Sequence, residues 1–485
     1  MKTRHAWAWR AWLLVALLAA SGSSWAVDLQ AGVPALRADV VVLDDTGMRP
    51  DELDEFQRQP PAERRRRADA ILALRPQATG VRFLRLQADD ALADFPGMLA
   101  DSELVLADSA IDRRLRKIVL VTRAEALIQA QRAAEAIPLA SQAIEIVPTD
   151  SNAWFARGWA RYQVDQDRTD DALADLDRAL QLEPDEGVGR YRRAVVLASR
   201  GALDRAAQDY ERAVQLVPED EPARREYGVL LIERGAPEAA LAQFEVALRL
   251  RPGDPSAWVG REHAHLVLKR FDDVVADARE AMALGGTDSD LANAHSYLAT
   301  ALWKKSDFAG AAREFQSVLA FTDDHRIAKS VGQMQWFSGQ LPQAIQTFRG
   351  QVTWPDSNPY TLLYLFILQV HVDPAAEAAA TAELASLATP HQPHEWGDTL
   401  VDLVLGRTTL AATLVEADAA DTDRLRAGHR CEADYFAAER LLLHGQREAA
   451  SGLLEEAHSV CPSTYIEAQA VAAERQRLAA QSPSH

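Results

Sequence analysis

The chain is 485 residues long, with 25% charged and 48% hydrophobic residues, which excludes wholesale disorder and a multi-span membrane protein. Lys and Arg number 52 against 71 Asp and Glu, giving a net charge of −19, and so acidic a surface repels phosphate backbones. We therefore expect no nucleic-acid partner. The two cysteines, Cys431 and Cys461, are too few for a disulfide-rich scaffold or a four-ligand zinc site, but they suffice for one bridge.

Residues 1–26 have the organisation of a secretory signal. A basic start precedes an apolar run over residues 11–20, and small residues occupy the positions before a cut after Ala26. We expect a non-lipidated periplasmic protein that begins at Val27. An uncleaved anchor is the alternative, because the apolar stretch extends back to Ala6 if Arg10 is tolerated, but ten clean apolar residues fall short of the ~18 that span a membrane. No later apolar run is long enough to span a bilayer.

Residues 27–116 form an N-terminal region without a clear period. The segment from Ala35 to Asp45 has β-branched residues at strand-like density, and Pro60 to Leu74 reads as a helix. The remainder looks mainly helical. This region is either a degenerate start of the array that follows or a small separate cap, and the sequence leaves both open.

From residue 117 to 390 the sequence repeats with a period near 34 residues. Ala172, Ala206, Ala240 and Ala344 are each followed four residues later by Leu, Tyr or Phe. Each unit reads as two helical patterns: small residues allow close helix approach, the aromatic fills the gap to the next unit, and a proline ends the second helix. Equivalent positions along the array are 136, 172, 206, 240, 274, 311, 344 and 378, and Ala450 lies two periods further on.

Several repeat positions agree at once. The third unit carries Ala194, Leu197, Ala206, Tyr210, Ala213 and Pro218, and the fourth carries Gly228, Leu231, Ala240, Phe244, Ala247 and Pro252. This pattern resembles the tetratricopeptide repeat (TPR). The resemblance implies an all-α, right-handed superhelical solenoid of about ten helix pairs, in which the first helix of each pair lines a concave groove. We expect a divergent helical pair over residues 391–430, and a terminal unit with a capping helix over residues 431–485.

The TPR register also predicts which side chains face the groove. Aromatic side chains there give rigid contact area at small entropic cost, and the interleaved cations could bind a peptide carboxylate or acidic side chains. The alternative is that Trp159, Trp303 and Trp336 pack between successive units. The predicted protein-binding residues are Phe155, Trp159, Tyr162, Tyr191, Arg192, Arg225, His263, Tyr297, Trp303, Lys304, Lys329, Trp336 and Phe337.

The cysteine pair belongs to the last unit. Cys431 lies at the first residue of that unit, and Cys461 lies just before the closing Pro462. Because the second helix of a pair returns antiparallel to the first, the two side chains should be neighbours. In an oxidising compartment we expect a disulfide that closes a loop of about 30 residues. Two buried free thiols are the alternative.

The stretch from Glu395 to Glu474 is similar to the last repeats of the new-lipoprotein-I type of TPR proteins in the Gram-negative envelope. The likeness rests on EWGDTLVDLVLG, on CEADYFAAERLLLHGQREAASGLLEEA and on CPSTYIEAQAVAAE. That family acts as adaptors that dock proteases and peptidoglycan hydrolases, which implies a scaffold. The lipid-bearing N-terminal cysteine is absent, the chain is far longer, and Ala438 stands where a glycine is usual. Membrane anchoring and specific partners therefore do not carry over.

No catalytic or cofactor motif is evident. His391 and His394 have a spacing that a metal could use, but they lie in a proline-containing loop with no third ligand nearby. Gly187 and Gly189 lack the strand and third glycine of a dinucleotide loop. We therefore expect no enzyme, no cofactor and no metal. The expected function is a periplasmic adaptor that binds envelope proteins, linked to proteolysis or peptidoglycan turnover; the alternative is a structural component of a secretion or exopolysaccharide-export assembly.

Overall fold

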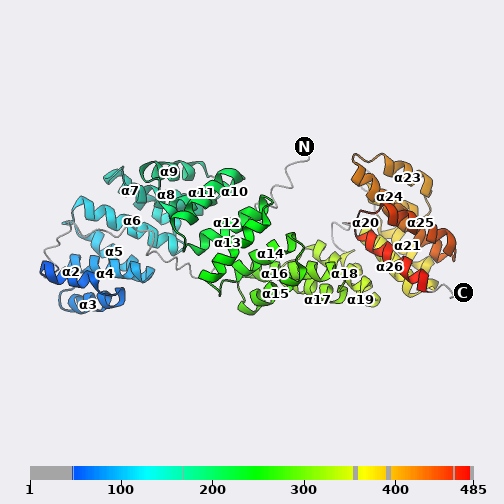
Figure 1. Cartoon of the computed structure of the whole chain (residues 1–485), viewed down its shortest axis with the longest axis horizontal. Helices are drawn as coiled ribbons and strands as arrows, with labels where there is room; N and C mark the ends of the chain where they lie inside the picture. Colours follow the sequence, from blue (N-terminus) through cyan, green and yellow to red (C-terminus); the bar gives the residue numbers. More distant parts are fainter. Residues whose placement is uncertain are drawn as a thin grey trace. The chain divides into compact units, whose positions relative to one another are not determined.

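The computed structural model describes residues 46, 48–167, 169–352, 359–388, 395–462 and 465–480 (Figure 1). These residues contain 25 α-helices, α2 to α26, and no β-strand, which confirms the all-α expectation. The chain forms two compact units: unit 1 extends to Leu268 and includes Arg279–Asp290, and unit 2 comprises Lys269–Ala278 and the chain from Leu291 onward. The predicted signal, the strand-like segment 35–45, and both His391 and His394 lie outside the described residues.

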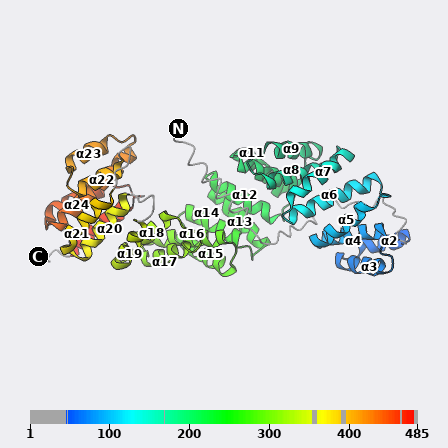
Figure 2. The same cartoon turned by 180° about the vertical axis from the view of Figure 1, so that it is seen from behind.

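Unit 1 is built from helices joined by short turns, so that each helix packs against the one before it (Figures 1 and 2). The helices are α2 (Pro50–Arg58), α3 (Pro61–Leu74), α4 (Thr79–Ala91), α5 (Phe95–Ala107), α6 (Arg113–Gln129), α7 (Ala133–Ile146), α8 (Ser151–Val164), α9 (Asp170–Leu182), α10 (Gly187–Ser199), α11 (Leu203–Leu216), α12 (Glu221–Glu233), α13 (Pro237–Leu250) and α14 (Pro255–Val267). Helix α15 (Phe271–Leu284) contributes residues to both units.

The turns between successive pairs share one design. The second helix of a pair ends two residues before a proline, which cannot continue the helical hydrogen bonding. Two residues after the proline, a carboxylate accepts a hydrogen bond from a backbone amide at the start of the next helix. The prolines are Pro148, Pro184, Pro218 and Pro252, and the capping residues are Asp150, Glu186, Asp220 and Asp254.

Small residues set the distance between the helices of a pair. Gly228 on α12 faces Phe244 on α13, and a Cβ at Gly228 would lie 2.7 Å from the phenyl ring. A Cβ at Gly260, in the following pair, would lie 2.3 Å from the same ring. Phe244 therefore fills the space both within its own pair and toward the next one, as the repeat register predicts.

The predicted period places seven of its eight array positions, and Ala450, in the core. Each of these residues is 0% exposed: Ala136, Ala172, Ala206, Ala240, Val274, Ala311, Ala344 and Ala450. The eighth position, Ala378, is exposed, so that assignment is wrong. The 3₁₀ helix η3 (Pro374–Ala376) precedes α21 and shifts the phase, so that Ala380, at 3% exposure, is buried instead.

The helices before residue 113 continue the same packing. Helix α3 matches the helix predicted from Pro60 to Leu74, and contacts run in order from α3 to α4, from α4 to α5 and from α5 to α6. Phe83, Met98 and Val119 join α4, α5 and α6 in one apolar cluster. The described helices of this region therefore contact one another in chain order and reach α6, the first helix of the array.

Unit 2 continues the alternation of first and second helices. Its helices are α16 (Asp288–Lys304), α17 (Phe308–Val318), α18 (His325–Phe337), α19 (Leu341–Gln351), α20 (Pro359–Val372), α21 (Glu377–Leu387), α22 (Trp396–Val404), α23 (Leu410–Asp418), α24 (Asp423–Leu443), α25 (Arg447–Val460) and α26 (Ile466–Ala480). The twenty helices from α6 to α25 make the ten expected pairs.

Helix α20 lies at the centre of unit 2. Every residue from Thr361 to Leu368 is buried, because α19, α21 and α22 all contact this helix. The most apolar run of the described chain is therefore a core helix. Within the described residues, no helix combines the length and apolar character needed to cross a membrane.

Candidate protein-binding surface

The first helix of each pair in unit 1 carries the residues predicted to face a groove. Three of the aromatic ones are buried: Phe155 is 3% exposed, Tyr162 is 2% exposed and Tyr191 is 8% exposed. All three belong to one apolar cluster formed by helices α8 to α12. These rings stabilise the packing between pairs and offer little surface for a partner.

Trp159 is partly exposed, and the rest of its side chain packs against two apolar clusters, so it also takes part in the packing between pairs that the alternative predicts. Its ring lies 5.3 Å from that of Tyr162, and the guanidinium of Arg192 lies 5.9 Å from the centre of the indole. Arg192 also donates to both carboxylate oxygens of Glu125, at 2.9 Å each. Helices α6, α8 and α10, the first helices of three successive pairs, supply these side chains. The bidentate ion pair fixes the cation beside the indole.

Asp90 on α4 adds a second carboxylate next to Glu125. It is half-buried, and this burial, followed by the charge of Glu125, raises the pKa of Asp90 to about 6. No basic side chain of the described residues pairs with Asp90. We call Asp90, Glu125, Trp159 and Arg192 the Trp159 surface. Its indole face and excess negative charge suit a ligand that carries an apolar group next to a cation.

The predicted cation Arg225 on α12 is already held by carboxylates of the chain itself. Its guanidinium donates to Asp254 at 2.9 Å and to Glu226 at 3.1 Å. Like Arg192, it is therefore not available for an acidic ligand, and the geometry does not support the expected recognition of a peptide carboxylate by these two arginines. His263 on α14 is half-buried, and burial lowers the pKa of its imidazole, which keeps the ring neutral near pH 7.

In unit 2 the C-terminal helix α26 covers part of the predicted binding residues. The indole of Trp303 on α16 donates to the side chain of Gln469 at 2.7 Å. The hydroxyl of Tyr364 on α20 donates to the carboxylate of Glu467. Ile466, at the start of α26, packs against apolar clusters on both α16–α18 and α20–α24. Helix α26 thus lies against first helices, where the register places a ligand.

The predicted residues of α18 take part in packing inside unit 2. The ring of Trp336 lies 5.4 Å from that of Phe337 and 5.7 Å from that of Tyr364. The amine of Lys329 lies 5.6 Å from the centre of the Tyr360 ring, and burial lowers the pKa of this lysine. These contacts agree with the alternative in which the tryptophan packs between units.

Tyr297 and Lys304 on α16 complete the predicted set. Tyr297 is half-buried, whereas Lys304 is exposed, with its amine 4.2 Å from the centre of the Trp303 ring. Lys304 therefore adds a surface cation beside an indole that α26 already contacts.

A buried carboxylate that sequence reasoning missed lies beneath α26. Glu432 on α24 is 4% exposed and accepts hydrogen bonds from the hydroxyl of Tyr360, at 3.0 Å, and from the indole of Trp396. Burial, followed by the charge of Glu467, raises the pKa of Glu432 to about 8. The repeat register does not show whether a glutamate at this position is buried or exposed to solvent, so the sequence alone could not identify Glu432.

Cys431 and Cys461 form the predicted disulfide, with their Cα atoms 5.0 Å apart and 30 positions apart in the chain. The prediction that Cys431 is the first residue of the last unit is wrong. Helix α24 begins at Asp423, so Cys431 lies in its interior and not at the start of a helix. Because α25 ends at Val460, its C-terminus still returns beside α24 at the level of Cys431.

A polar link inside the pairs also escaped the sequence analysis. Arg157 donates to both oxygens of Asp175, at 2.8 and 2.7 Å, and Arg193 does the same to Asp209, at 2.6 and 2.8 Å. Both aspartates lie three residues after a repeat alanine, and Glu314, at the same offset, contacts His295 at 2.7 Å. The sequence did contain a sign of this link, because an acidic residue recurs three positions after the repeat alanine.

Comparisons with known proteins agree with this architecture. Two family models described as tetratricopeptide repeats match the chain, one over residues 157–221 and the other over residues 197–261. Both matches fall on helices α8 to α14, where the pairs, the caps and the glycine–aromatic contacts are most regular.

Several solved structures are similar to parts of the chain. PilF of Pseudomonas aeruginosa is 17% identical, with a TM-score of 0.40 over 47% of this chain and 99% of that one. A tetratricopeptide-repeat protein from Parabacteroides merdae is 14% identical, with a TM-score of 0.38 over 52% and 97% of the two chains. PilW, a type IV pilus biogenesis factor, is 17% identical, with a TM-score of 0.38 over 43% and 95%. The family matches show that this chain carries tetratricopeptide repeats over residues 157–261, and the helix pairs on either side continue the same all-α repeat architecture.

Proposed function

We propose that this protein is an exported scaffold that binds segments of other envelope proteins through the Trp159 surface. Tetratricopeptide repeats generally build non-catalytic scaffolds whose stacked first helices present an extended binding surface. The observation that supports this site is the partly exposed Trp159 on α8, flanked by the Arg192–Glu125 pair and by Asp90. The other aromatic residues predicted on α8 and α10 are buried.

The chemistry of the surface defines the ligand that we propose. An indole contributes large contact area at small entropic cost, and it also attracts cations to its face. Asp90 and Glu125 carry two negative charges against the single positive charge of Arg192. A partner segment with an apolar side chain next to Lys or Arg satisfies both features.

Export is part of the proposal. The organisation of residues 1–26 supports it, and so does the disulfide between Cys431 and Cys461, because such bonds persist in oxidising compartments. The likeness of Glu395 to Glu474 to envelope adaptors suggests proteolysis or peptidoglycan turnover as the process served. N-terminal sequencing of the protein recovered from a periplasmic fraction tests this part, and we expect it to begin at Val27.

A crosslinking pull-down from native envelope extract tests the binding surface. The bait is the chain from Val27 to His485, as wild type and as Trp159→Ala, with Trp336→Ala as the control. The control also removes an indole, but one that packs inside unit 2. We expect partners to be lost from Trp159→Ala and retained by Trp336→Ala. Partners retained by both variants would contradict the assignment of the Trp159 surface.

A second measurement tests the charge preference. Once a partner segment is known, its affinity is measured by fluorescence anisotropy for wild type and for Asp90→Asn. We expect a loss of about tenfold, because a charge-assisted contact is replaced by a neutral one. When the Lys or Arg of the segment is replaced by Ala, the two proteins should bind equally. If Asp90→Asn lowers the affinity equally for the original and the Ala-substituted peptide, Asp90 supports the fold of the protein and does not contact the cation of the ligand.

A further inference from the structure

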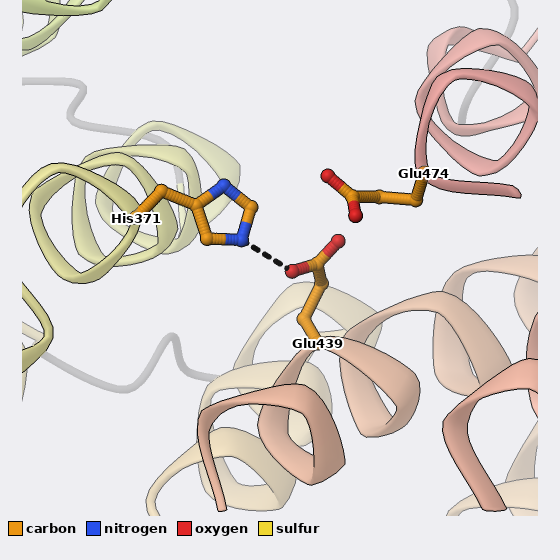
Figure 3. A group of neighbouring side chains, drawn as sticks. All are labelled: His371, Glu439 and Glu474. Carbon is orange, nitrogen blue, oxygen red and sulfur yellow. Dashed lines mark hydrogen bonds and ion pairs between the residues drawn. The ribbon is translucent and has the colours of Figure 1, made fainter. Parts of the chain in front are cut away.

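Three side chains that could bind a metal ion converge inside unit 2 (Figure 3). His371 comes from α20, Glu439 from α24 and Glu474 from α26. One nitrogen of the imidazole and one oxygen of each carboxylate lie within 4.8 Å of one another. The imidazole Nε2 of His371 lies 2.9 Å from Oε2 of Glu439. No sequence motif marks this group, because its members are 68 and 35 positions apart.

Two of the three side chains are buried and His371 is half-buried, and one carboxylate oxygen has no hydrogen-bond partner among the described residues. Glu439 is 2% exposed and Glu474 is 8% exposed. The second oxygen of Glu439, Oε1, accepts no hydrogen bond from any described residue. Figure 3 shows that this oxygen faces the carboxylate of Glu474. A buried carboxylate oxygen that faces another carboxylate is unfavourable unless a cation or a proton lies between them.

Neighbouring groups suit a bound cation. Arg477 donates to Oε2 of Glu474 at 2.7 Å, which holds that carboxylate in place. The hydroxyl of Tyr435, one turn before Glu439 on α24, is also buried and has no hydrogen-bond partner among the described residues. Outer groups of this kind usually orient the ligands of a metal and the water bound to it.

We propose that His371, Glu439 and Glu474 bind a divalent transition-metal ion, for which Zn²⁺ is the best fit. One imidazole nitrogen and two carboxylate oxygens form a donor set that zinc accepts, whereas Mg²⁺ and Ca²⁺ prefer oxygen donors alone. The two carboxylates offset the charge of a dication, and a water molecule completes a four-coordinate site. Since each ligand belongs to a different helix, the ion ties α26 to α20 and α24.

Metal binding to the full chain is the direct test. The protein is prepared without a histidine tag, stripped with a chelator, and titrated with Zn²⁺ by calorimetry, with the bound metal counted by elemental analysis. We expect one ion per chain for wild type and a loss of affinity of about 100-fold or more for His371→Ala, because a direct ligand is removed. The double variant His391→Ala/His394→Ala is the matched control and should bind as wild type does.

The thermal stability of the wild-type protein gives a second test, which does not require any variant to fold. Zn²⁺ should raise the midpoint of thermal unfolding of the wild-type protein, and a chelator should reverse the change. Glu474→Gln, which keeps an acceptor for Arg477, should abolish this response. The proposal is overturned if wild type binds no ion tightly, or if the affinity is lost in the His391/His394 control and kept in His371→Ala.

Discussion

At the scale of single residues, the fold depends on where small side chains fall. The repeat positions of successive second helices are, with one exception, fully buried, and most of them hold alanine, which lets neighbouring helices approach closely. Their spacing in the sequence was sufficient to locate them, since seven of the eight positions are buried. The predicted burial of Ala378 was wrong because a local 3₁₀ helix shifts the phase of the repeat. Counting residues between repeat positions cannot detect such a shift.

Ala206 gives a direct test of this role. Ala206→Leu adds three carbons where the side chain is 0% exposed, and we expect a loss of about 1–3 kcal/mol in the free energy of unfolding from overpacking. Chemical denaturation followed by circular dichroism measures it. Ala378→Leu is the matched control, because it occupies the same predicted repeat position but is exposed, and its effect should be small. Equal effects of the two substitutions would show that burial at Ala206 is misassigned.

Glu432 makes stability depend on pH. Its pKa of about 8 lies above that of a carboxyl in the unfolded chain, near 4.3. Between these values the folded state keeps a proton that the unfolded state releases, so this group lowers stability as pH rises from about 5 to 8. Glu432→Gln cannot titrate, and its carbonyl oxygen can accept the same bonds from Tyr360 and Trp396. The variant should therefore match wild type near pH 5 and melt higher near pH 8.

Thermal unfolding across this pH range, for both proteins, is the measurement. Glu455→Gln serves as the control, because Glu455 pairs with Arg475 on the surface and is largely exposed. This control should not reproduce the pH-dependent gain. A constant difference between Glu432→Gln and wild type at every pH would assign the effect to packing and not to the proton.

At the scale of elements, the sequence predicted that the helices form, but it did not predict where α24 begins or what α26 contacts. The prolines predicted where the second helices α7, α9, α11 and α13 end, because a proline acts through the nearest turn of the chain. The acidic residues that cap the following helices were not part of the prediction. Helix α24 begins eight residues before the predicted start, since nothing local ends a helix between Asp423 and Cys431. The contacts of α26 with Trp303 and Tyr364 join residues more than 100 positions apart, which no local pattern reports.

The link between α24 and α25 leads to a prediction about the disulfide. Replacing both cysteines with serine opens a loop of 30 residues, and we expect a loss of about 2–4 kcal/mol in stability. Denaturation of wild type with and without a reducing agent, compared with the double variant, measures this loss. The reducing agent should lower the stability of wild type to that of the variant and leave the variant unchanged. No effect of reduction on wild type would mean that the thiols are not joined in solution.

At the scale of the whole molecule, the repeat number could be predicted from the sequence, whereas the contacts of the predicted binding residues could be predicted only in part. The register placed both Trp159 and Arg192 in the groove, and the two are neighbours on successive first helices because stacked repeats bring equivalent positions side by side. It could not show that Arg192 and Arg225 are neutralised by Glu125 and Asp254, since ion pairing depends on side chains from other pairs.

The net charge of −19 leads to a prediction about association with partners. A basic segment should be attracted at long range, so its association rate constant should fall steeply as salt rises from about 50 to 300 mM. The dissociation rate constant should change much less, because it reflects the short-range contact with Trp159. Stopped-flow fluorescence at several salt concentrations separates the two. An association rate constant that is independent of salt would indicate an uncharged ligand.

The position of α26 determines when unit 2 can finish folding. This helix is synthesised after the other described helices of unit 2, yet Val471 is 0% exposed, and Trp303, which lies 166 positions earlier in the chain, hydrogen-bonds to Gln469. Repeats of unit 1 can pack one after another as they emerge, whereas unit 2 must wait for α26. During that interval its apolar first helices are open to chaperones and to proteases. A late stop codon would make this state permanent, and the truncated product would be degraded.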